Sequence, residues 1–117
     1  MPDPNLIYKI ATLALYAPAR DGTVFAGMPI DAADGYLHLS TATQLPDTLR
    51  LHFAGQSDLV LLAVRAADLG DKLVWEPSRG GQLFPHYYGG LPTSAIAWEA
   101  PLSVTADGRC TLPDAVR

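Results

Sequence analysis

Charge is scarce in this chain, and the charges that it has are unevenly distributed among residue types. Only 17% of the 117 residues are charged, and eight basic residues against twelve acidic ones give a net charge of −4. A nucleic-acid-binding domain usually carries a basic face, so this balance argues against nucleic acid as a bulk partner. Ten of the twelve acids are Asp, a residue favoured in turns and caps, so most of them need no functional explanation.

Cysteine and long apolar runs are also nearly missing. The single cysteine, Cys110, excludes an intramolecular disulfide and a multi-cysteine zinc site. We interpret Cys110 as a small apolar residue rather than a nucleophile, and the composition fits a reducing, cytoplasmic compartment. No apolar run approaches the roughly 18 residues that cross a bilayer, and nothing resembles a signal peptide. We therefore expect no membrane partner.

The common fingerprints of cofactor and nucleophile sites are absent from the sequence. It contains no Gly-x-Gly-x-x-Gly motif, no phosphate-binding P-loop and no Gly-x-Ser-x-Gly elbow. Its three histidines, His38, His52 and His86, lack the spacing of metal ligands on one helix. We therefore predict no metal site, and we interpret His52 as a surface residue.

The residues that are present predict one small α+β domain over 1–117. Half of the chain is apolar, and ten Gly and ten Pro interrupt it without a domain break. The pattern predicts one main helix, Pro46–Phe53, because Thr41-x-x-Gln44 can cap a helix and three apolar residues follow at a spacing of four. Short apolar runs predict strands at Leu6–Ile10, Tyr36–Ser40, Leu59–Val64, Leu73–Trp75, Ala95–Trp98 and Leu102–Thr105.

Two glycine-containing segments are expected outside these strands. Asp107-Gly108 predicts a hairpin turn into a last strand at Cys110–Leu112, which with the tail makes up residues 106–117. Residues 77–92 hold four Gly and three Pro, so we predict a long loop there without regular structure. A loop of this length in a small domain is more often functional than not.

His38 and Ser40 form the first candidate site. If Leu37 and Leu39 face the core, strand alternation places His38 and Ser40 together on the opposite face. An imidazole and a hydroxyl in that arrangement can hydrogen-bond the hydroxyls of a sugar. An equally good interpretation is that His38 only anchors a turn.

The second candidate site follows Trp75 in the glycine-rich segment. Glu76, one of two glutamates, can steady a developing cation or orient a hydroxyl, and Arg79 among glycines can meet a phosphate. The alternative to a binding site is a rigid loop, held in place by its aromatic residues, with a structural role only. The remaining candidates are an imidazole and rings that could stack on a flat ligand: His86, Phe84, Tyr87 and Tyr88.

Several of these motifs carry a resemblance to a known family. The segments Asp34-Gly35-Tyr36-Leu37-His38-Leu39-Ser40-Thr41 and Phe84-Pro85-His86-Tyr87-Tyr88-Gly89 resemble small bacterial proteins classed as domain of unknown function 952. The resemblance covers roughly positions 6 to 105 and also includes Ile7–Ile10, Gln44, His52-Phe53, Leu59–Val64 and Trp75-Glu76.

A more distant similarity implies an activity. The order of Tyr8-Lys9, His38-Leu39-Ser40 and an apolar strand ending near Val64 is similar to RNA 2′-phosphotransferases and the ADP-ribosyltransferase superfamily. That similarity implies two short sheets flanking a cleft, with NAD or an ADP-ribose-type ligand bound between them. Lys9 stands where those enzymes usually offer a His, and the late catalytic position implies Glu76 or Arg79.

Two functions follow from these observations. One is a transferase that moves an ADP-ribosyl or phosphoryl group, with His38, Glu76 and His86 as catalytic residues. In that case Lys9, Ser40, Arg79, Tyr87 and Tyr88 would bind the ligand. The alternative is a non-catalytic module that binds a small metabolite or a protein, and Lys9 in place of the usual His favours it slightly.

Overall fold

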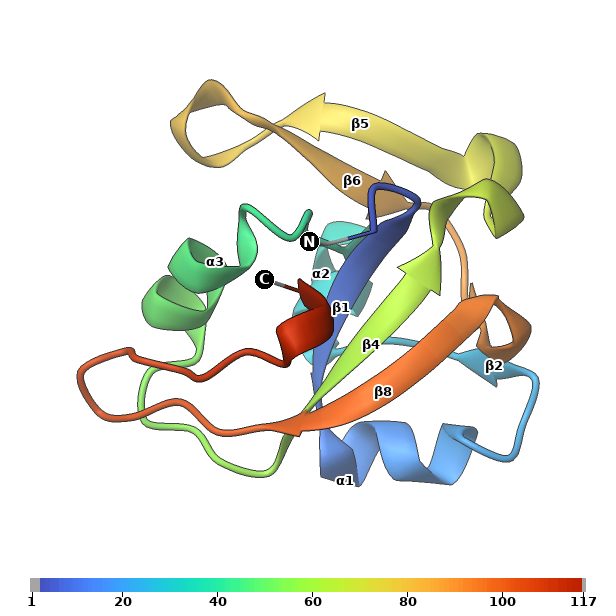
Figure 1. Cartoon of the computed structure of the whole chain (residues 1–117). Coiled ribbons are helices and arrows are strands. Elements are labelled where there is room, and N and C mark those ends of the chain that lie inside the picture. The colour runs from blue at the N-terminus through green and yellow to red at the C-terminus, as the bar shows by residue number, and fades with distance from the viewer. Residues whose placement is uncertain (1–2, 117) are drawn as a thin grey trace.

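The centre of the computed structural model, which describes residues 3–116, is a three-stranded antiparallel sheet in the order β1-β4-β8. β1 (Leu6–Thr12) and β8 (Ile96–Leu102) flank β4 (Leu59–Arg65), as Figure 1 shows. All residues of β4 except Arg65 are buried, as the run of apolar residues predicts for a central strand. The predicted first strand and the predicted Leu59–Val64 strand are confirmed.

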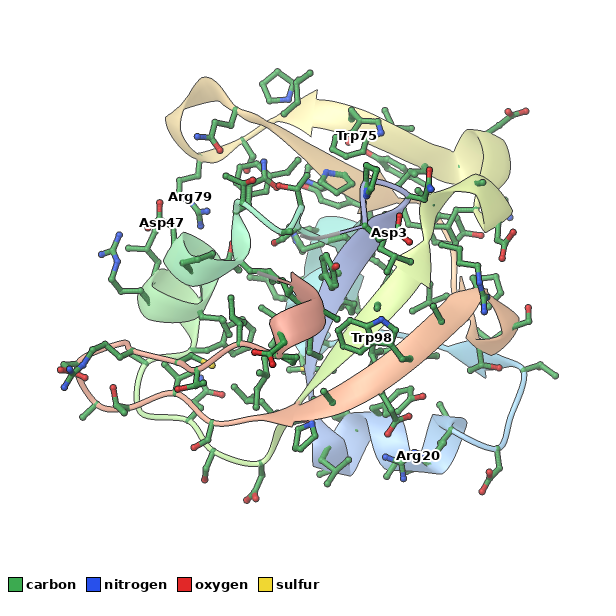
Figure 2. All side chains as sticks on the ribbon, in the orientation of Figure 1. Asp3, Arg20, Asp47, Trp75, Arg79 and Trp98 are labelled. Carbon is green, nitrogen blue, oxygen red and sulfur yellow. The ribbon has the colours of Figure 1, made fainter. Side chains whose placement is uncertain are left out.

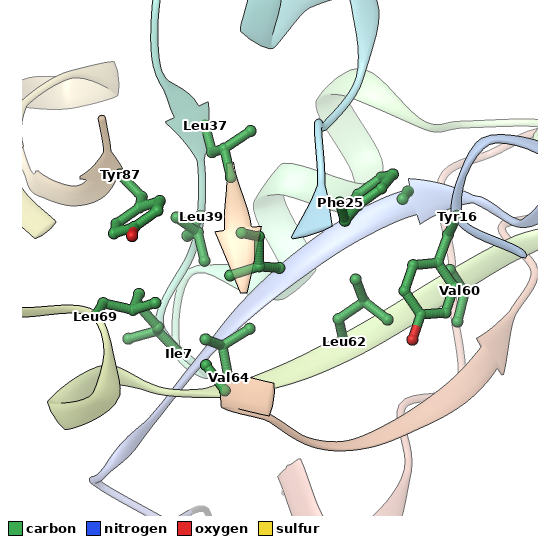
Figure 3. Close-up of a cluster of buried hydrophobic side chains, with 13 residues drawn as sticks. Ile7, Tyr16, Phe25, Leu37, Leu39, Val60, Leu62, Val64, Leu69 and Tyr87 are labelled. Atoms are coloured by element: carbon green, nitrogen blue, oxygen red, sulfur yellow. The ribbon is translucent and has the colours of Figure 1, made fainter. Parts of the chain in front are cut away.

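Apolar side chains cover both faces of this central sheet. On one face, alternate residues of β1 and β4 join a cluster that also contains Tyr16, Phe25, Leu37, Leu39 and Tyr87 (Figure 3). On the other face, Tyr8, Ile10 and Leu61 pack against Leu45 and Leu49. Cys110 is half-buried against this second cluster, in agreement with its interpretation as a small apolar residue.

The helix over the second face is α3 (Leu45–His52), close to the predicted Pro46–Phe53. The reciprocal bonds expected of Thr41 and Gln44 form in the turn before the helix, where the Thr41 amide donates to Gln44 Oε1 at 3.0 Å and the Gln44 amide donates to Thr41 Oγ1 at 3.3 Å. The helix itself begins at Leu45, and its N-cap residue Gln44 makes no side-chain cap bond. Leu45 and Leu49 are fully buried, so the apolar stripe faces the core as predicted. Two shorter helices precede α3: α1 (Leu13–Tyr16) and α2 (Pro29–Asp34).

Two smaller sheets complete the domain. β3 (Leu37–His38), β6 (Leu83–Tyr87) and β5 (Leu73–Pro77) form an antiparallel sheet in the order β3-β6-β5, and β2 (Val24–Phe25) pairs with β7 (Leu91–Pro92). Single turns of 3₁₀ helix connect the strands at Ala17–Ala19, Ala66–Asp68, Gly70–Lys72, Arg79–Gly81, Thr93–Ala95 and Asp114–Val116.

The prediction of a loop over residues 77–92 is wrong. β5 and β6 form a hairpin whose tip spans 78–82, where the Ser78 amide donates to the Gln82 carbonyl at 2.9 Å. Gly80 and Gly81 have φ of 67° and 78°, so these two glycines make the tight tip of a hairpin rather than part of a long loop. Two prolines fit into these strands without disrupting them. Pro77 is the last residue of β5, and Pro85 in β6 lacks only one N–H donor for the hydrogen bonds between strands.

Pro85 also explains why the predicted strand Tyr36–Ser40 is shorter than expected. The Leu39 amide donates to the Pro85 carbonyl at 3.1 Å, but Pro85 has no N–H to return, so β3 ends at His38. Ser40 instead exchanges two backbone hydrogen bonds of 2.8 Å with Tyr8 in β1. The chain therefore crosses from the small sheet to the central sheet between residues 38 and 40.

The C-terminal predictions need a similar correction. One strand, β8, replaces the two predicted at Ala95–Trp98 and Leu102–Thr105, because Val104 and Thr105 bond with Gln56 and Gly55 instead of a strand. The chain turns at Asp107-Gly108, but Cys110–Leu112 form no strand. The fold is thus a single small α+β domain with three sheets rather than two. No helix within residues 3–116 is long and apolar enough to cross a membrane.

Candidate functional site

A cavity of about 490 Å³ lies where the small β3-β6-β5 sheet, β1 and α3 meet. It has the size of an ordinary small-molecule site. Five of the polar candidate site residues line it: Lys9, His38, Ser40, Arg79 and His86. Its walls also include Met28, Pro29, Ile30, Phe53 and Phe84, so polar groups stand in a largely apolar surround.

Strand alternation explains why the polar groups gather on one side. His38 pairs with His86 across β3 and β6, while Leu37 pairs with Tyr87. Leu37, Leu39 and Tyr87 enter the first core cluster, so the alternate positions 38, 40, 84 and 86 turn to the cavity. The rings of His38 and His86 lie 5.5 Å apart between centroids, nearly perpendicular to each other. The predicted shared face of His38 and Ser40 is confirmed.

A carboxylate holds the ring of His86. Nδ1 of His86 lies 2.8 Å from Glu76 Oε1, and the hydroxyl of Tyr88 donates to the same oxygen at 2.7 Å. These two hydrogen bonds, that from Tyr88 first, keep the pKa of Glu76 below its ordinary value. The same bond raises the pKa of Tyr88 to about 12. An ionised carboxylate only accepts, so His86 donates from Nδ1 and its Nε2 is the nitrogen left for a ligand.

His38 is held in a comparable way from the other side. Its Nε2 lies 2.8 Å from Asp34 Oδ2, one helical turn earlier in sequence. Tyr36 fits between the two histidines, stacked on His86 at a centroid distance of 4.2 Å and tilted against His38 at 4.7 Å. Tyr88 packs on Tyr36 as well, at 5.3 Å. Each imidazole therefore has one nitrogen on a carboxylate and one face on an aromatic ring.

Lys9 and Asp31 form a buried ion pair behind the histidines. Their charged atoms lie 2.7 Å apart, and both side chains are almost completely buried. Lys9 Nζ also donates to the His38 carbonyl at 3.0 Å, and Asp31 Oδ1 accepts the His38 amide at 2.9 Å. Burial lowers the pKa of Lys9, and the Asp31 charge opposes that shift. The ion pair therefore holds the backbone of His38 at both its carbonyl and its amide.

The close approach at this ion pair needs a glycine. Gly27 has φ of 100°, and a Cβ there would lie 2.3 Å from Leu37 Cδ2 and 2.8 Å from Asp31 Oδ2. Both distances are too short for any side chain, so the loop before α2 can pass this close only as glycine. This glycine therefore lets the loop pack directly against the Asp31 side chain.

Arg79 reaches the cavity from the tip of the β5–β6 hairpin, directed toward α3 in Figure 2. Its guanidinium donates to Thr48 Oγ1 at 3.2 Å and lies 4.9 Å from the centre of the Phe84 ring. Thr48 Oγ1 is also 3.3 Å from Ser40 Oγ. Arg79, Thr48 and Ser40 thus form a row of donors along one wall, and an anion is the group that such a row attracts.

Four predicted site residues either lie outside the cavity lining or have their charge already engaged. Tyr87 packs in the first core cluster, so it does not reach a ligand in the cavity. Glu76 and Tyr88 do not appear among the described lining residues and act on the cavity through His86. Lys9 lines the cavity, but its charge is engaged by Asp31. His52 is exposed, as predicted, and stands at the rim of the cavity.

Four residues that matter here were not singled out from the sequence: Tyr36, Thr48, Asp31 and Asp34. Asp34 stands four residues before His38, a spacing that could have indicated the pair, since α2 ends between them. Tyr36 stands two residues before His38, and its ring contacts both histidines. The sequence held no signal for Asp31 and Thr48, because both are brought in by tertiary packing.

A second concavity lies on the opposite side of α3. It is an open groove of about 820 Å³ between α3 and residues 101–112, with Arg50 and Arg109 on its walls. None of the histidines lines it. Within residues 3–116, no group of three His, Cys, Asp or Glu side chains is arranged to hold a metal ion.

The class of protein that emerges is a small α+β domain with one histidine-bearing cavity between its sheets. The chain belongs to the family described as "Protein of unknown function (DUF952)", whose model matches residues 10–99. No curated protein matches the chain significantly.

Solved structures of one bacterial protein are similar over almost the whole chain. The crystal structure of protein CC0527 from Caulobacter crescentus is 46% identical, with a TM-score of 0.87 over 95% of this chain and 97% of that one. The solution structure of CC0527 is 47% identical, with a TM-score of 0.77 over 89% and 90% of the two chains. The fold and the family are therefore shared.

Proposed function

We propose that the cavity binds a nucleotide of the ADP-ribose type, such as ADP-ribose or NAD. The observation that carries this proposal is that His38, Ser40, Arg79 and His86 open onto one cavity of suitable volume. Arg79, with the hydroxyls of Thr48 and Ser40 beside it, would hold a phosphate. His38 and His86 would hydrogen-bond ribose hydroxyls, and Phe84 and Phe53 would cover an apolar ring face.

Binding is better supported than transfer of ADP-ribose from NAD. Such a transfer needs a carboxylate beside the ribose carbon to stabilise the cation that forms when nicotinamide leaves. Glu76, the residue expected in that role, has one oxygen committed to both His86 and Tyr88 and does not itself line the cavity. Lys9, at the first-strand position, is committed to Asp31.

Isothermal titration calorimetry with ADP-ribose and with NAD tests the proposal. Arg79→Ala should weaken binding by roughly 10- to 100-fold, which is what losing one charge-assisted contact of about 1.5–3 kcal/mol costs. Arg109→Ala is the matched control, because it removes the same charge from the exposed loop beside the other groove. Equal losses in both variants, or no binding by the unaltered protein, would overturn the proposal.

The second candidate is cleavage of NAD in the same cavity, which differs from binding by turnover. The ion pair of Lys9 with Asp31 and the hydrogen bonds of Glu76 argue against it. Nicotinamide release by the protein incubated with NAD separates the two functions. Release at the background rate, together with saturable binding, is the result that we expect.

A further inference from the structure

The two cavity histidines are arranged for more than binding. Each ring has one nitrogen on a carboxylate, His86 on Glu76 and His38 on Asp34, both at 2.8 Å. This arrangement fixes which nitrogen carries the proton and leaves the other nitrogen for a reacting group. Two such imidazoles on one face can move two protons in one reaction, one off a nucleophile and one onto a leaving group.

We infer that this pair catalyses the hydrolysis of a phosphodiester closed between two hydroxyls of one ribose, as in a ribonucleoside 2′,3′-cyclic phosphate. The inference rests on the proposed binding of a ribose nucleotide, and it names a reaction for that site. The leaving group of such an ester is a sugar alkoxide, which needs a proton when the P–O bond breaks. The attacking water must lose a proton at the same time.

The step balances on the residues of the cavity. Nε2 of His86 takes a proton from water as the water oxygen bonds to phosphorus. The bond from phosphorus to one ribose oxygen then breaks, and the imidazolium of His38 gives that oxygen its proton. The product is a ribonucleoside monophosphate with one free hydroxyl, and the proton on His86 returns to His38 through solvent. No oxidant, reductant or second substrate other than water is consumed.

Arg79 supplies the charge that this reaction needs. Its guanidinium sits on the same wall as Ser40, which follows His38 by two residues and lines the same cavity. A guanidinium can donate two parallel hydrogen bonds to two non-bridging oxygens of a phosphate. It thereby stabilises the additional negative charge that develops on these oxygens in the transition state. The phosphate would then lie over both imidazoles.

The surroundings of the pair make its geometry rigid. Tyr36 contacts both rings, and Tyr88 packs against Tyr36 while donating to Glu76. His86 is only 3% exposed, whereas the side chain of His38 is 34% exposed. Glu76, Asp34, Tyr36 and Tyr88 are positioning residues in this scheme. Only His38, His86 and Arg79 touch the reacting group.

Incubation with adenosine 2′,3′-cyclic phosphate, followed by phosphorus NMR, tests the inference. We expect conversion to adenosine monophosphate and a rate at least about 100-fold lower in His86→Ala and in His38→Ala, the usual cost of losing a general acid or base. His52→Ala is the matched control, since this histidine stands at the cavity rim. Circular dichroism of each variant checks that it is folded.

The positioning role of Glu76 has its own readout. Glu76→Gln should lower kcat with little change in KM, because the substituted amide holds His86 less well while Arg79 still binds the phosphate. Glu76→Asp should restore part of the lost kcat if its oxygen still reaches Nδ1. An equal loss of kcat in His52→Ala, or a change confined to KM in Glu76→Gln, would contradict the assigned roles.

The outcomes separate this inference from the proposed function. One outcome is that the protein binds ADP-ribose and yet hydrolyses the cyclic phosphate no faster than a His38→Ala/His86→Ala double variant does. That result overturns the hydrolysis and leaves the binding function standing. If neither binding nor hydrolysis is seen, both are overturned. Hydrolysis without affinity for ADP-ribose would support the acid–base pair and overturn the larger nucleotide as its ligand.

Discussion

The central sheet is built from strands of 7 residues and the β3-β6-β5 sheet from strands of 2 and 5 residues, and the two sheets use their faces differently. Both faces of β4 are covered by apolar clusters, so none of its buried side chains is free for chemistry. In β3 and β6 one face joins the core, and the other carries the two histidines into a cavity. The core therefore forms on both faces of the central sheet, whereas the candidate site lies on one face of the small sheet, and few residues belong to both.

Lys9 and Asp31 are the main exception, because this pair joins the two sheets. Lys9 lies on β1 of the central sheet and holds the backbone of His38 in the small sheet. Lys9→Ala should cost the largest amount of stability, about 3–5 kcal/mol, since it leaves the Asp31 carboxylate buried without a counterion. Urea unfolding followed by fluorescence measures the loss.

Lys72→Ala provides the control for that prediction. It removes a lysine with the same charge from an exposed position at the start of β5. A loss for Lys9→Ala as small as that for Lys72→Ala, under about 1 kcal/mol, would show that the ion pair does not tie the sheets together.

Leu62→Ala changes a residue of the central sheet alone and leaves the residues of the β3-β6-β5 sheet unaltered. Leu62 is fully buried in the first core cluster, so truncation should cost about 2–5 kcal/mol of unfolding free energy, within the range for buried leucines. Leu51→Ala, at an exposed position of α3, should cost less than 1 kcal/mol. At a temperature where Leu62→Ala is folded, its calorimetric affinity for ADP-ribose should equal that of the unaltered protein. A weakened affinity would mean that core and cavity are coupled.

The two sheets also differ in how far the sequence predicts them. The central sheet follows from local pattern, because the run at Leu59–Val64 has the length of a buried strand and is short for a helix. The alternation of Leu37 and Leu39 with His38 and Ser40 likewise predicted that His38 and Ser40 share one face. For these segments the hydrophobic period and the tertiary structure agree.

The β5–β6 hairpin was missed because its signals are nonlocal. Proline and glycine between residues 77 and 92 are typical of a loop, and only the pairing of β6 with β3 and β5 at once makes a strand of Leu83–Tyr87. The partners of the histidines depend on the same pairing. Glu76 meets His86 only because the hairpin register places Glu76 opposite Phe84, two residues from His86.

The hydrogen bond between Tyr88 and Glu76 gives the smallest expected effect and the most local test of the polar face. It raises the pKa of Tyr88 to about 12 and lowers the pKa of Glu76. Glu76→Gln should therefore bring the pKa of Tyr88 back toward its ordinary value of 10, as measured by carbon NMR of the tyrosine ring. Tyr16 is an internal control, since its pKa of about 12 arises first from burial and then from Glu99.

The signs of the two shifts define where this bond stabilises the fold. A raised tyrosine pKa contributes stability below about pH 10, and that contribution disappears as the pH rises through about 12. A lowered glutamate pKa contributes above the ordinary value, and its contribution disappears as the pH falls through the folded-state value. Glu76→Gln should thus flatten the stability profile at both ends while Tyr16 titrates unchanged. A Tyr88 pKa that stays near 12 in this variant would mean that burial, not Glu76, holds the proton on Tyr88, and that His86 is the sole partner of this carboxylate.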